Sequence, residues 1–242
     1  MDTIKYPGLI PSHEHKRMEA LQPYQVLGSP GQELFNDFVS VVAKLFDMPI
    51  ALVSLVRAAD VVFIGNAGLP EALVVNREDS MCSVAILNDG LTVFDDIVAE
   101  PCELVNPLVA QQMNLGFYAG QALRTPDGLA VGSLCVLDRQ RRELSPAEGL
   151  LLKDLALVAQ ELLRLQAVRM ADATLVAALR TRLDGPVQQT LTRLATLAEL
   201  RQLAPPADTE EAQRYDDSRV DEARYLTQTI HRELLAAMAE VV

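Results

Sequence analysis

Three cysteines carry the most reactive side chains in this sequence of 242 residues. Cys82 lies in the segment SMCSVAILND, Cys102 follows a proline, and Cys135 lies within the apolar run GSLCVLD. Thiol-based reduction needs an attacking thiolate beside a resolving thiol, and no such pair is evident in the sequence. A cysteine in the middle of a strand is usually a small buried apolar side chain, which is our interpretation of Cys135. An odd number of cysteines without a secretory signal predicts reduced thiols in the cytoplasm.

The positions of the histidines exclude imidazole-held cofactors from most of the chain. The three histidines are His13, His15 and His231, so residues 16–230 contain none. Haem or zinc bound through imidazole is therefore not expected there. His13 and His15 could bind a metal as a pair, but a polar N-terminal segment is the simpler interpretation. We expect His231 at a surface or an interface, and we expect no metal site and no cofactor.

Composition and charge narrow the classes of partner. The chain has 33 acidic and 21 basic residues, which gives a net charge of −12, and an acidic surface repels the phosphates of nucleic acid. The longest strongly apolar run covers residues 48–56, whereas a membrane-spanning helix needs about 20 apolar residues. The N-terminus lacks the apolar core of a secretory signal, and no glycine-rich phosphate loop is present. We therefore expect a cytoplasmic protein without a nucleic-acid or membrane partner.

The elements that must position these side chains alternate between helices and strands. Two hairpins are predicted, one from residues 49–57 and 60–66 and one from residues 116–124 and 129–138. The second hairpin surrounds Thr-Pro-Asp-Gly, a turn signature with proline at its second position. Helical spacing or short apolar segments predict the remaining elements, which are a helix over 30–47, short helices over 80–87 and 107–113, and a strand over 91–94.

The last third of the chain has a helical pattern. Ser145-Pro-Ala-Glu resembles a capping box, and leucines then recur at steps of three and four residues, which is typical of a coiled-coil seam. The seam crosses Gly185-Pro186, where we favour a kinked continuous helix over a helix that ends there. After a polar connector over 204–219, a last helix completes a predicted hairpin. Because this seam has no other evident partner, we expect a homodimeric bundle. The predicted dimerisation residues are Leu151, Leu155, Val158, Leu162, Leu165, Leu179, Leu183, Leu191, Leu194, Leu226, Ile230 and Leu234.

Residues 20–169 resemble a bacterial GAF domain, a small-molecule sensor module. The resemblance rests on the stretches at 20–56, 80–89 and 106–109, and above all on GFYAGQALRTPDGLAVGSLCVLDRQRRELSPAE at 116–148. It implies an α+β fold with an antiparallel sheet of five or six strands flanked by helices, and a ligand cavity under the loops of residues 80–118. No bilin is expected, because Cys82 is followed by serine and not by histidine. The candidate pocket residues are Phe63, Cys82, Phe94, Phe117, Tyr118 and Cys135, although the aromatic residues equally suit a filled core.

A second resemblance concerns the segment AALRTRL at 177–183. It is similar to the H-E-L-R-T-P-L box of histidine-kinase dimerisation domains, with Ala177 at the position of the phospho-accepting histidine. The resemblance implies a dimerisation hairpin without phosphotransfer, and a generic helical tail is the alternative. The predicted organisation is a polar lead at 1–19, a sensor domain at 20–144, a connecting helix at 145–169 and a helical hairpin at 170–242.

These observations together favour a cytoplasmic signal-transduction sensor or adaptor that is not an enzyme. Its expected partners are an unknown small-molecule ligand and a second copy of the chain, and a signalling protein is left open as a further partner. One alternative is a free methionine sulfoxide reductase of the GAF type, which would use the thiols. The other alternative is a structural interaction module whose pocket is filled by its own side chains.

Overall fold

The computed structural model describes residues 6–24, 32–69, 73–171, 173–202 and 209–239, and it describes the backbone alone at residues 32, 168–171, 173–184, 201–202, 210–211 and 213. A six-stranded sheet lies at its centre, in the order β3-β2-β1-β6-β5-β4, and each neighbouring pair of strands is antiparallel. The predicted α+β class and the antiparallel sheet are confirmed. The strands are β1 (Ile50–Val56), β2 (Asp60–Ala67), β3 (Val74–Asn76), β4 (Thr92–Phe94), β5 (Phe117–Arg124) and β6 (Ala130–Asp138).

Both predicted hairpins are confirmed, and each has a local cause. The β5–β6 hairpin turns at Thr125–Gly128, where the Gly128 amide donates to the Thr125 carbonyl at 2.9 Å and Gly128 adopts a φ of 80°. Glycine reaches this left-handed conformation without steric cost. The β1–β2 hairpin is closed by Arg57, whose guanidinium pairs with the Asp60 carboxylate. Strand β3 was not predicted, whereas β4, which is equally short, corresponds to the strand predicted over 91–94.

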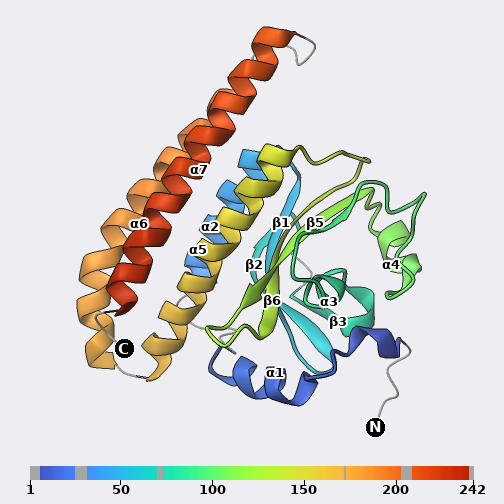
Figure 1. Ribbon diagram of the computed structural model, residues 1–242, viewed down its shortest axis with the longest axis horizontal. Helices are drawn as coiled ribbons and strands as arrows, with labels where there is room; N and C mark the ends of the chain where they lie inside the picture. Colours follow the sequence, from blue (N-terminus) through green and yellow to red (C-terminus); the bar gives the residue numbers. More distant parts are fainter. Residues whose placement is uncertain (1–5, 25–31, 70–72, 172, 203–208, 240–242) are drawn as a thin grey trace.

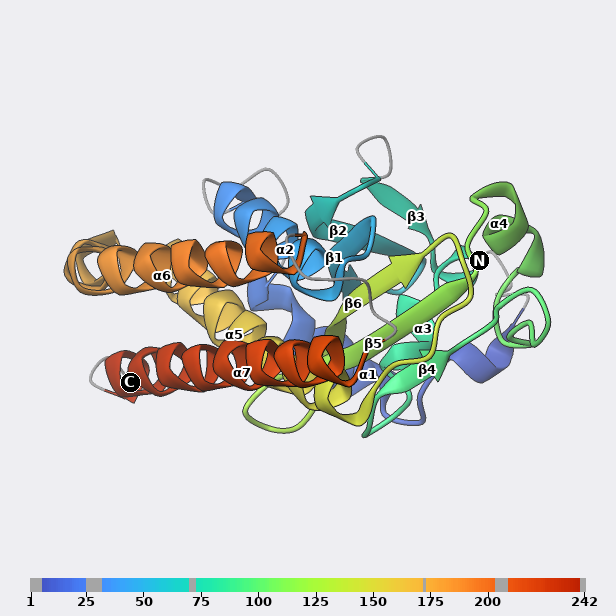
Figure 2. The ribbon, with the colours of Figure 1, turned by 90° about the horizontal axis from the view of Figure 1, so that it is seen from above.

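Alternating side chains divide the sheet into two differently covered faces. One face packs against α2 (Gln32–Phe46) and α5 (Pro146–Ala171), and α6 (Ala173–Gln202) and α7 (Glu210–Ala239) form a further layer outside them (Figures 1 and 2). The opposite face packs against η1 (Pro7–Leu9), α3 (Cys82–Ala85), α4 (Pro107–Gln112) and the loops around them. Each face has its own apolar cluster, so the sheet separates two cores.

The C-terminal helices fold back along the rest of the chain. Helix α5 ends at Ala171, and α6 runs back alongside it, so the connecting helix and the first helix of the predicted hairpin are antiparallel (Figure 1). Helix α6 does continue through Pro186, as we favoured. Helix α7 begins at Glu210, earlier than the connector predicted, and the Thr209 hydroxyl accepts a hydrogen bond from the Ala212 amide at its N-terminus. The last third is therefore three packed helices.

The apolar seam is covered within the single chain. The seam residues of α5 are at most 5% exposed, and those predicted seam residues of α6 and α7 whose side chains are described pack in the same core. A second copy of the chain is therefore not needed to bury this seam, which corrects the reason for expecting a dimer. Homodimerisation itself stays a prediction. The side chains of Ala177, Leu179 and Leu183 lie outside the described part. The predicted dimerisation residues whose side chains are described are Leu151, Leu155, Val158, Leu162, Leu165, Leu191, Leu194, Leu226, Ile230 and Leu234.

The N-terminal segment is also part of the packed structure. We expected a polar lead, but α1 (Glu14–Leu21) lies against the sheet and its Arg17 is fully buried. The Arg17 guanidinium donates to the Val56 carbonyl at 2.7 Å and to the Glu14 carboxylate at 2.7 Å. Glu14 also pairs with the buried Arg77. An arginine at a buried position carries no hydrophobic signal, which is why the sequence pattern missed this helix. Among the described residues, no helix combines the length and apolar composition of a membrane span.

Candidate ligand-binding cavity

An apolar cavity lies between the sheet and the α3–α4 side of the molecule. Its volume is about 60 Å³, enough for a few water molecules and well below the roughly 300–1,000 Å³ of a typical ligand pocket. In this structure the surrounding side chains therefore leave room for only a small occupant. A larger occupant requires the elements above the sheet to move outward. The lining residues are Phe63, Leu69, Val75, Asp79, Ser80, Met81, Cys82, Val105, Asn106, Val109, Ala110, Met113, Leu115, Tyr118 and Leu137.

One end of the cavity is polar and holds two loops together. The Asp79 carboxylate accepts hydrogen bonds from the side-chain amides of Asn76 at 2.8 Å and Asn106 at 2.9 Å. Asn106 is also the N-cap of α4, because its side-chain oxygen accepts from the Leu108 amide at 3.2 Å. The Asn106 amide donates to the Glu78 carbonyl at 2.8 Å. The position of α4 above the cavity therefore depends on these contacts.

Tyr118 contributes a buried hydroxyl to the floor of the cavity. The residue is 0% exposed, and its hydroxyl makes no hydrogen bond of standard geometry within the part of the chain described, although the Ser133 hydroxyl and the thiols of Cys82 and Cys135 lie close to it. Burial raises the pKa of Tyr118 well above its usual value, and the neighbouring Cys82 and Cys135 add to this effect. The phenol is therefore neutral, with one donor and free acceptor capacity. A buried hydroxyl without a partner is destabilising unless a ligand or water binds it.

Cys82 and Cys135 meet beside this hydroxyl. Their Sγ atoms lie 3.7 Å apart, although the residues are 53 positions apart in sequence. A hydrogen bond from the Cys135 thiol lowers the pKa of Cys82, against the opposing effect of burial, and nearby serine hydroxyls lower it further. Burial and the adjacent Cys82 raise the pKa of Cys135. The pair therefore contains one acidic thiol, which lines the cavity, and one thiol that stays protonated.

The structure distributes the predicted pocket residues over three environments. Phe63, Cys82 and Tyr118 line the cavity. Cys135 is fully buried in strand β6, as interpreted, and its Sγ atom lies beside that of Cys82 without lining the cavity. Phe94 is half-buried at the edge of the same core and does not line the cavity, and Phe117 is buried on the opposite face, against the helices. Adjacent strand residues point to opposite faces, so Phe117 and Tyr118 cannot share a pocket.

Sequence reasoning missed the polar end and much of the cavity wall. Asp79, Asn106 and Met113 were not predicted as pocket residues. They lie at the ends of two short helices, residues 77–79 and α4. The asparagine-proline pair at the start of α4 is a helix-start signal that could have placed Asn106. The remaining wall residues carry no signal beyond being apolar.

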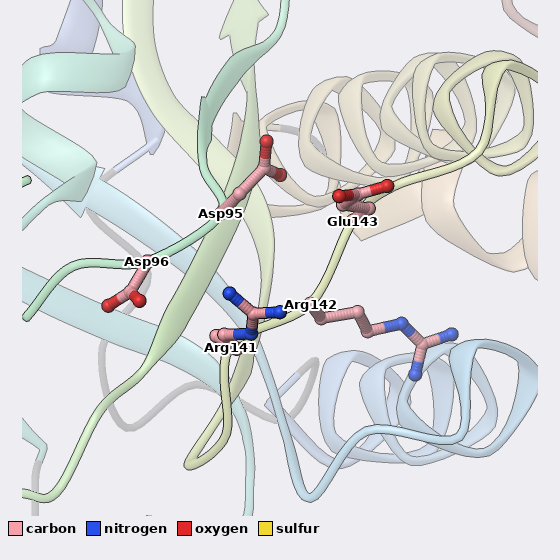
Figure 3. Close-up of a pocket in the computed structure, with 5 residues that line it drawn as sticks. All are labelled: Asp95, Asp96, Arg141, Arg142 and Glu143. Carbon is pink, nitrogen blue, oxygen red and sulfur yellow. The ribbon is translucent and has the colours of Figure 1, made fainter. Parts of the chain in front are cut away.

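A second hollow opens on the surface between two loops and is larger and polar. It has a volume of about 290 Å³ and is lined by Asp95, Asp96, Arg141, Arg142 and Glu143 (Figure 3). The Asp96 carboxylate accepts from the Val98 and Ala99 amides, and Arg142 pairs with Glu148 at 2.8 Å. Three carboxylates and two guanidiniums at one open site recognise neither anions nor cations well. No cluster of metal-ligating side chains occurs among the residues that the structure describes.

Comparisons with known proteins place these features in context. No family model matches the chain. It is 34% identical over 132 residues to a cyclic di-GMP phosphodiesterase of Pseudomonas aeruginosa, a match covering 54% of this chain and 22% of that protein. Solved structures similar to the chain include a free methionine-R-sulfoxide reductase from Neisseria meningitidis, with 17% identity, 65% and 91% of the two chains covered and a TM-score of 0.49. They also include the GAF domain of an Acinetobacter phosphoenolpyruvate-protein phosphotransferase, with 13% identity, 62% and 93% covered and a TM-score of 0.47.

The curated relative corrects one prediction. We expected a protein that is not an enzyme, and the relative is named as a phosphodiesterase, which overturns that expectation. The expectation rested on the lack of a recognisable catalytic motif in these 242 residues. The absence of such a motif from these residues says nothing about the activity of a longer protein. The chain spans only about a fifth of the length of the relative.

Proposed function

We propose that this chain is a GAF-type sensory module of a bacterial signalling protein, in which a small molecule binds between the sheet and the α3–α4 side. The observation that carries the proposal is the narrow apolar cavity lined by Tyr118, whose buried hydroxyl makes no hydrogen bond of standard geometry among the described residues. Natural structures rarely leave a buried hydroxyl without a partner, and a bound molecule or a functional role is among the explanations for such an exception. The match to a relative that turns over a signalling nucleotide supports a role in signalling.

The cavity also defines the chemistry of the proposed ligand. Apolar side chains form most of the wall, so the ligand has an apolar body that fits among residues such as Met113 and Phe63. The Tyr118 hydroxyl offers one hydrogen bond at the floor, and Asp79 and Asn106 offer further polar contacts at the far end. A ligand larger than a few atoms displaces α4 or the loop before it, because the present volume is small.

The sheet provides the proposed path to the output helices. Strand β5 presents Tyr118 to the cavity and Phe117 to the helix core. At the end of β5, the Arg124 amide donates to the Gln160 side chain of α5 at 2.9 Å. A ligand that favours one arrangement of β5 thereby favours one packing of α5, α6 and α7, by at most its differential affinity for the two arrangements. We assign the contact with a second copy or with a signalling protein to these outer helices.

Native mass spectrometry tests the proposed site. The full chain is incubated with a bacterial metabolite extract, and its mass is compared with that of Ala110→Phe, which fills the cavity. Gln111→Phe is the matched control, because Gln111 is exposed on the same short helix. We expect a bound small molecule on the wild type and on Gln111→Phe, and none on folded Ala110→Phe. An adduct that persists on Ala110→Phe, or no adduct on any of the three, contradicts the proposal.

Control of cyclic di-GMP turnover is a second candidate function, and the curated relative favours it. Under this candidate, the chain contributes to a phosphodiesterase activity of the kind that the relative's name states. The test measures the hydrolysis of cyclic di-GMP in two assays. One contains the purified chain alone, and the other contains the chain together with a separate, soluble cyclic di-GMP phosphodiesterase. Hydrolysis by the chain, or a change in the rate of the added enzyme, supports this candidate, and unchanged rates in both assays contradict it.

A further inference from the structure

We propose that Cys82 and Cys135 form a redox-active dithiol, which hydrogen peroxide or a small organic hydroperoxide oxidises to an intramolecular disulfide. The proposal rests on the position of the two thiols and is independent of the ligand of the proposed sensor. The Sγ atoms already lie 3.7 Å apart, and a disulfide requires about 2.05 Å. Forming the bond therefore requires the two Sγ atoms to approach each other by less than 2 Å, the difference between these two distances.

The surroundings of Cys82 suit it to be the attacking thiol. Cys82 lines the cavity of about 60 Å³, so a peroxide that enters this space comes into contact with the residue. Cys135 is 0% exposed and does not line the cavity, so it is protected from direct oxidation. The lowered pKa of Cys82 increases its thiolate fraction, and the thiolate is the reactive form. The two cysteines therefore have different roles, one attacking and one resolving.

The chemistry balances in two steps. The Cys82 sulfur attacks one peroxide oxygen, the O–O bond breaks, and the departing oxygen takes the thiol proton to leave as water or an alcohol. Cys82 is then a sulfenic acid. The Cys135 sulfur attacks the Cys82 sulfur, the S–S bond forms, and hydroxide leaves as water with the Cys135 proton. Two thiols lose two electrons in total, and the peroxide gains them.

The disulfide would change the cavity directly. Cys82 begins α3, which lies above the sheet, and Cys135 lies in the central strand β6. A covalent bond between them ties the cavity wall to the sheet. Because this wall must move to admit a larger ligand, oxidation should restrict ligand access, so the dithiol provides a redox input to the same domain.

Thiol mapping of the full chain tests the proposal. The reduced protein is treated with a few equivalents of hydrogen peroxide, the remaining thiols are alkylated, and non-reduced digests are analysed by mass spectrometry. We expect a Cys82–Cys135 cross-linked peptide, alkylation confined to Cys102, and a fall from three free thiols to one. Retention of all three thiols, overoxidation without a cross-link, or a cross-link through Cys102 overturns the proposal. Faster cross-linking with free methionine sulfoxide than with peroxide overturns the assigned oxidant.

Three variants separate the roles of the thiols. In Cys135→Ser we expect oxidation to stop at a Cys82 sulfenic acid, which dimedone traps, and Cys135→Ala replaces this variant if the serine form does not fold. In Cys82→Ser we expect Cys135 to react at least tenfold more slowly than Cys82 does in the wild type. Cys102→Ser is the control and should form the cross-link at the wild-type rate. Equal reactivity of Cys135 with and without Cys82 contradicts the assigned order.

Discussion

The hydroxyl of Tyr118 lies directly across Gly120, two residues further along β5. A Cβ atom placed at Gly120 would lie 2.3 Å from the Tyr118 hydroxyl oxygen and 2.8 Å from the adjoining ring carbon. No real contact is that short, so a side chain at 120 and the observed position of Tyr118 exclude each other. The glycine is therefore needed for the packing of the aromatic ring on the cavity floor.

Gly120→Ala should lower the free energy of unfolding by about 1–3 kcal/mol, the usual cost of overpacking a core. The added methyl group forces the Tyr118 ring out of a fully buried position. Urea denaturation measures the change. Gly90→Ala is the control, because nothing lies within 4 Å of its Cβ position, and it should stay within about 0.5 kcal/mol of the wild type. A Gly120→Ala protein as stable as Gly90→Ala would contradict the observed ring position.

Tyr118→Phe should leave the unligated protein as stable as the wild type or about 1 kcal/mol more stable. The substitution removes a buried hydroxyl that makes no hydrogen bond of standard geometry among the described residues, and with it the cost of keeping that group out of water. The same substitution should weaken ligand binding, because the floor of the cavity loses its hydrogen-bonding group. Urea denaturation of the unligated form and native mass spectrometry with metabolite extract give the two readouts. A loss of stability above 1 kcal/mol would show that the hydroxyl has a partner.

The Glu14 network should make the N-terminal packing sensitive to acid. Burial opposes the ionised form of Glu14, but hydrogen bonds from Arg17 and Arg77 outweigh it and lower the pKa from 4.5 to about 2. The folded pKa lies below the unfolded value, so the stabilisation is complete above about pH 5. It decreases as the pH falls from 5 towards 2. Thermal unfolding across this range should show the loss.

Glu14→Gln should lower the free energy of unfolding at neutral pH by about 2 kcal/mol. Removing one partner leaves the buried Arg17 and Arg77 without their counter-charge, at a cost below the roughly 3–5 kcal/mol of a fully buried pair because Glu14 is partly solvated. The difference from the wild type should narrow between pH 5 and 2. Glu19→Gln on the same helix, whose carboxylate is exposed, is the control with little effect. A difference that stays constant with pH would contradict the assigned role of the Glu14 charge.

Gly185→Ala should change the stability by less than about 1 kcal/mol. Gly185 lies inside α6, is exposed, and apart from its chain neighbours has nothing within 4 Å of its Cβ position. Alanine favours a helix over glycine by about 1 kcal/mol, but the ring of Pro186 opposes a Cβ atom on the preceding helical residue and offsets part of this gain. Differential scanning calorimetry measures the shift in Tm, which should stay within about 2–4 °C in a protein of this size. A larger shift in either direction would contradict this balance at the glycine-proline pair.

Local signals were enough to predict the hairpins and the helical content. The Thr-Pro-Asp-Gly turn and the alternating strands determine the β5–β6 pair through contacts between near neighbours in sequence. Strand alternation alone would also have separated Phe117 from Tyr118. By contrast, the proximity of Cys82 and Cys135 depends on how α3 packs over β6, which is a long-range contact without a sequence signature.

The C-terminal helices show a second limit of pattern reasoning. The leucine seam correctly indicated which face of α5 is buried, as the exposure of Leu155 and Leu162 confirms. A seam does not specify which element covers it, and here α6 and α7 of the same chain do so. The buried Arg17 illustrates the converse, because a polar residue that is buried through hydrogen bonds is invisible to hydrophobic periodicity.

A crystal of the full chain held under xenon pressure tests the central claim most directly. Xenon binds apolar cavities that it can reach from solvent, and it needs no knowledge of the natural ligand. The account predicts a xenon atom between Cys82, Met113 and Tyr118, and none in the polar hollow beside Asp95 and Arg141. Crystals that show no xenon beside Cys82 and Tyr118, or xenon only among the helices α5, α6 and α7, would contradict the assignment of this cavity as the ligand site.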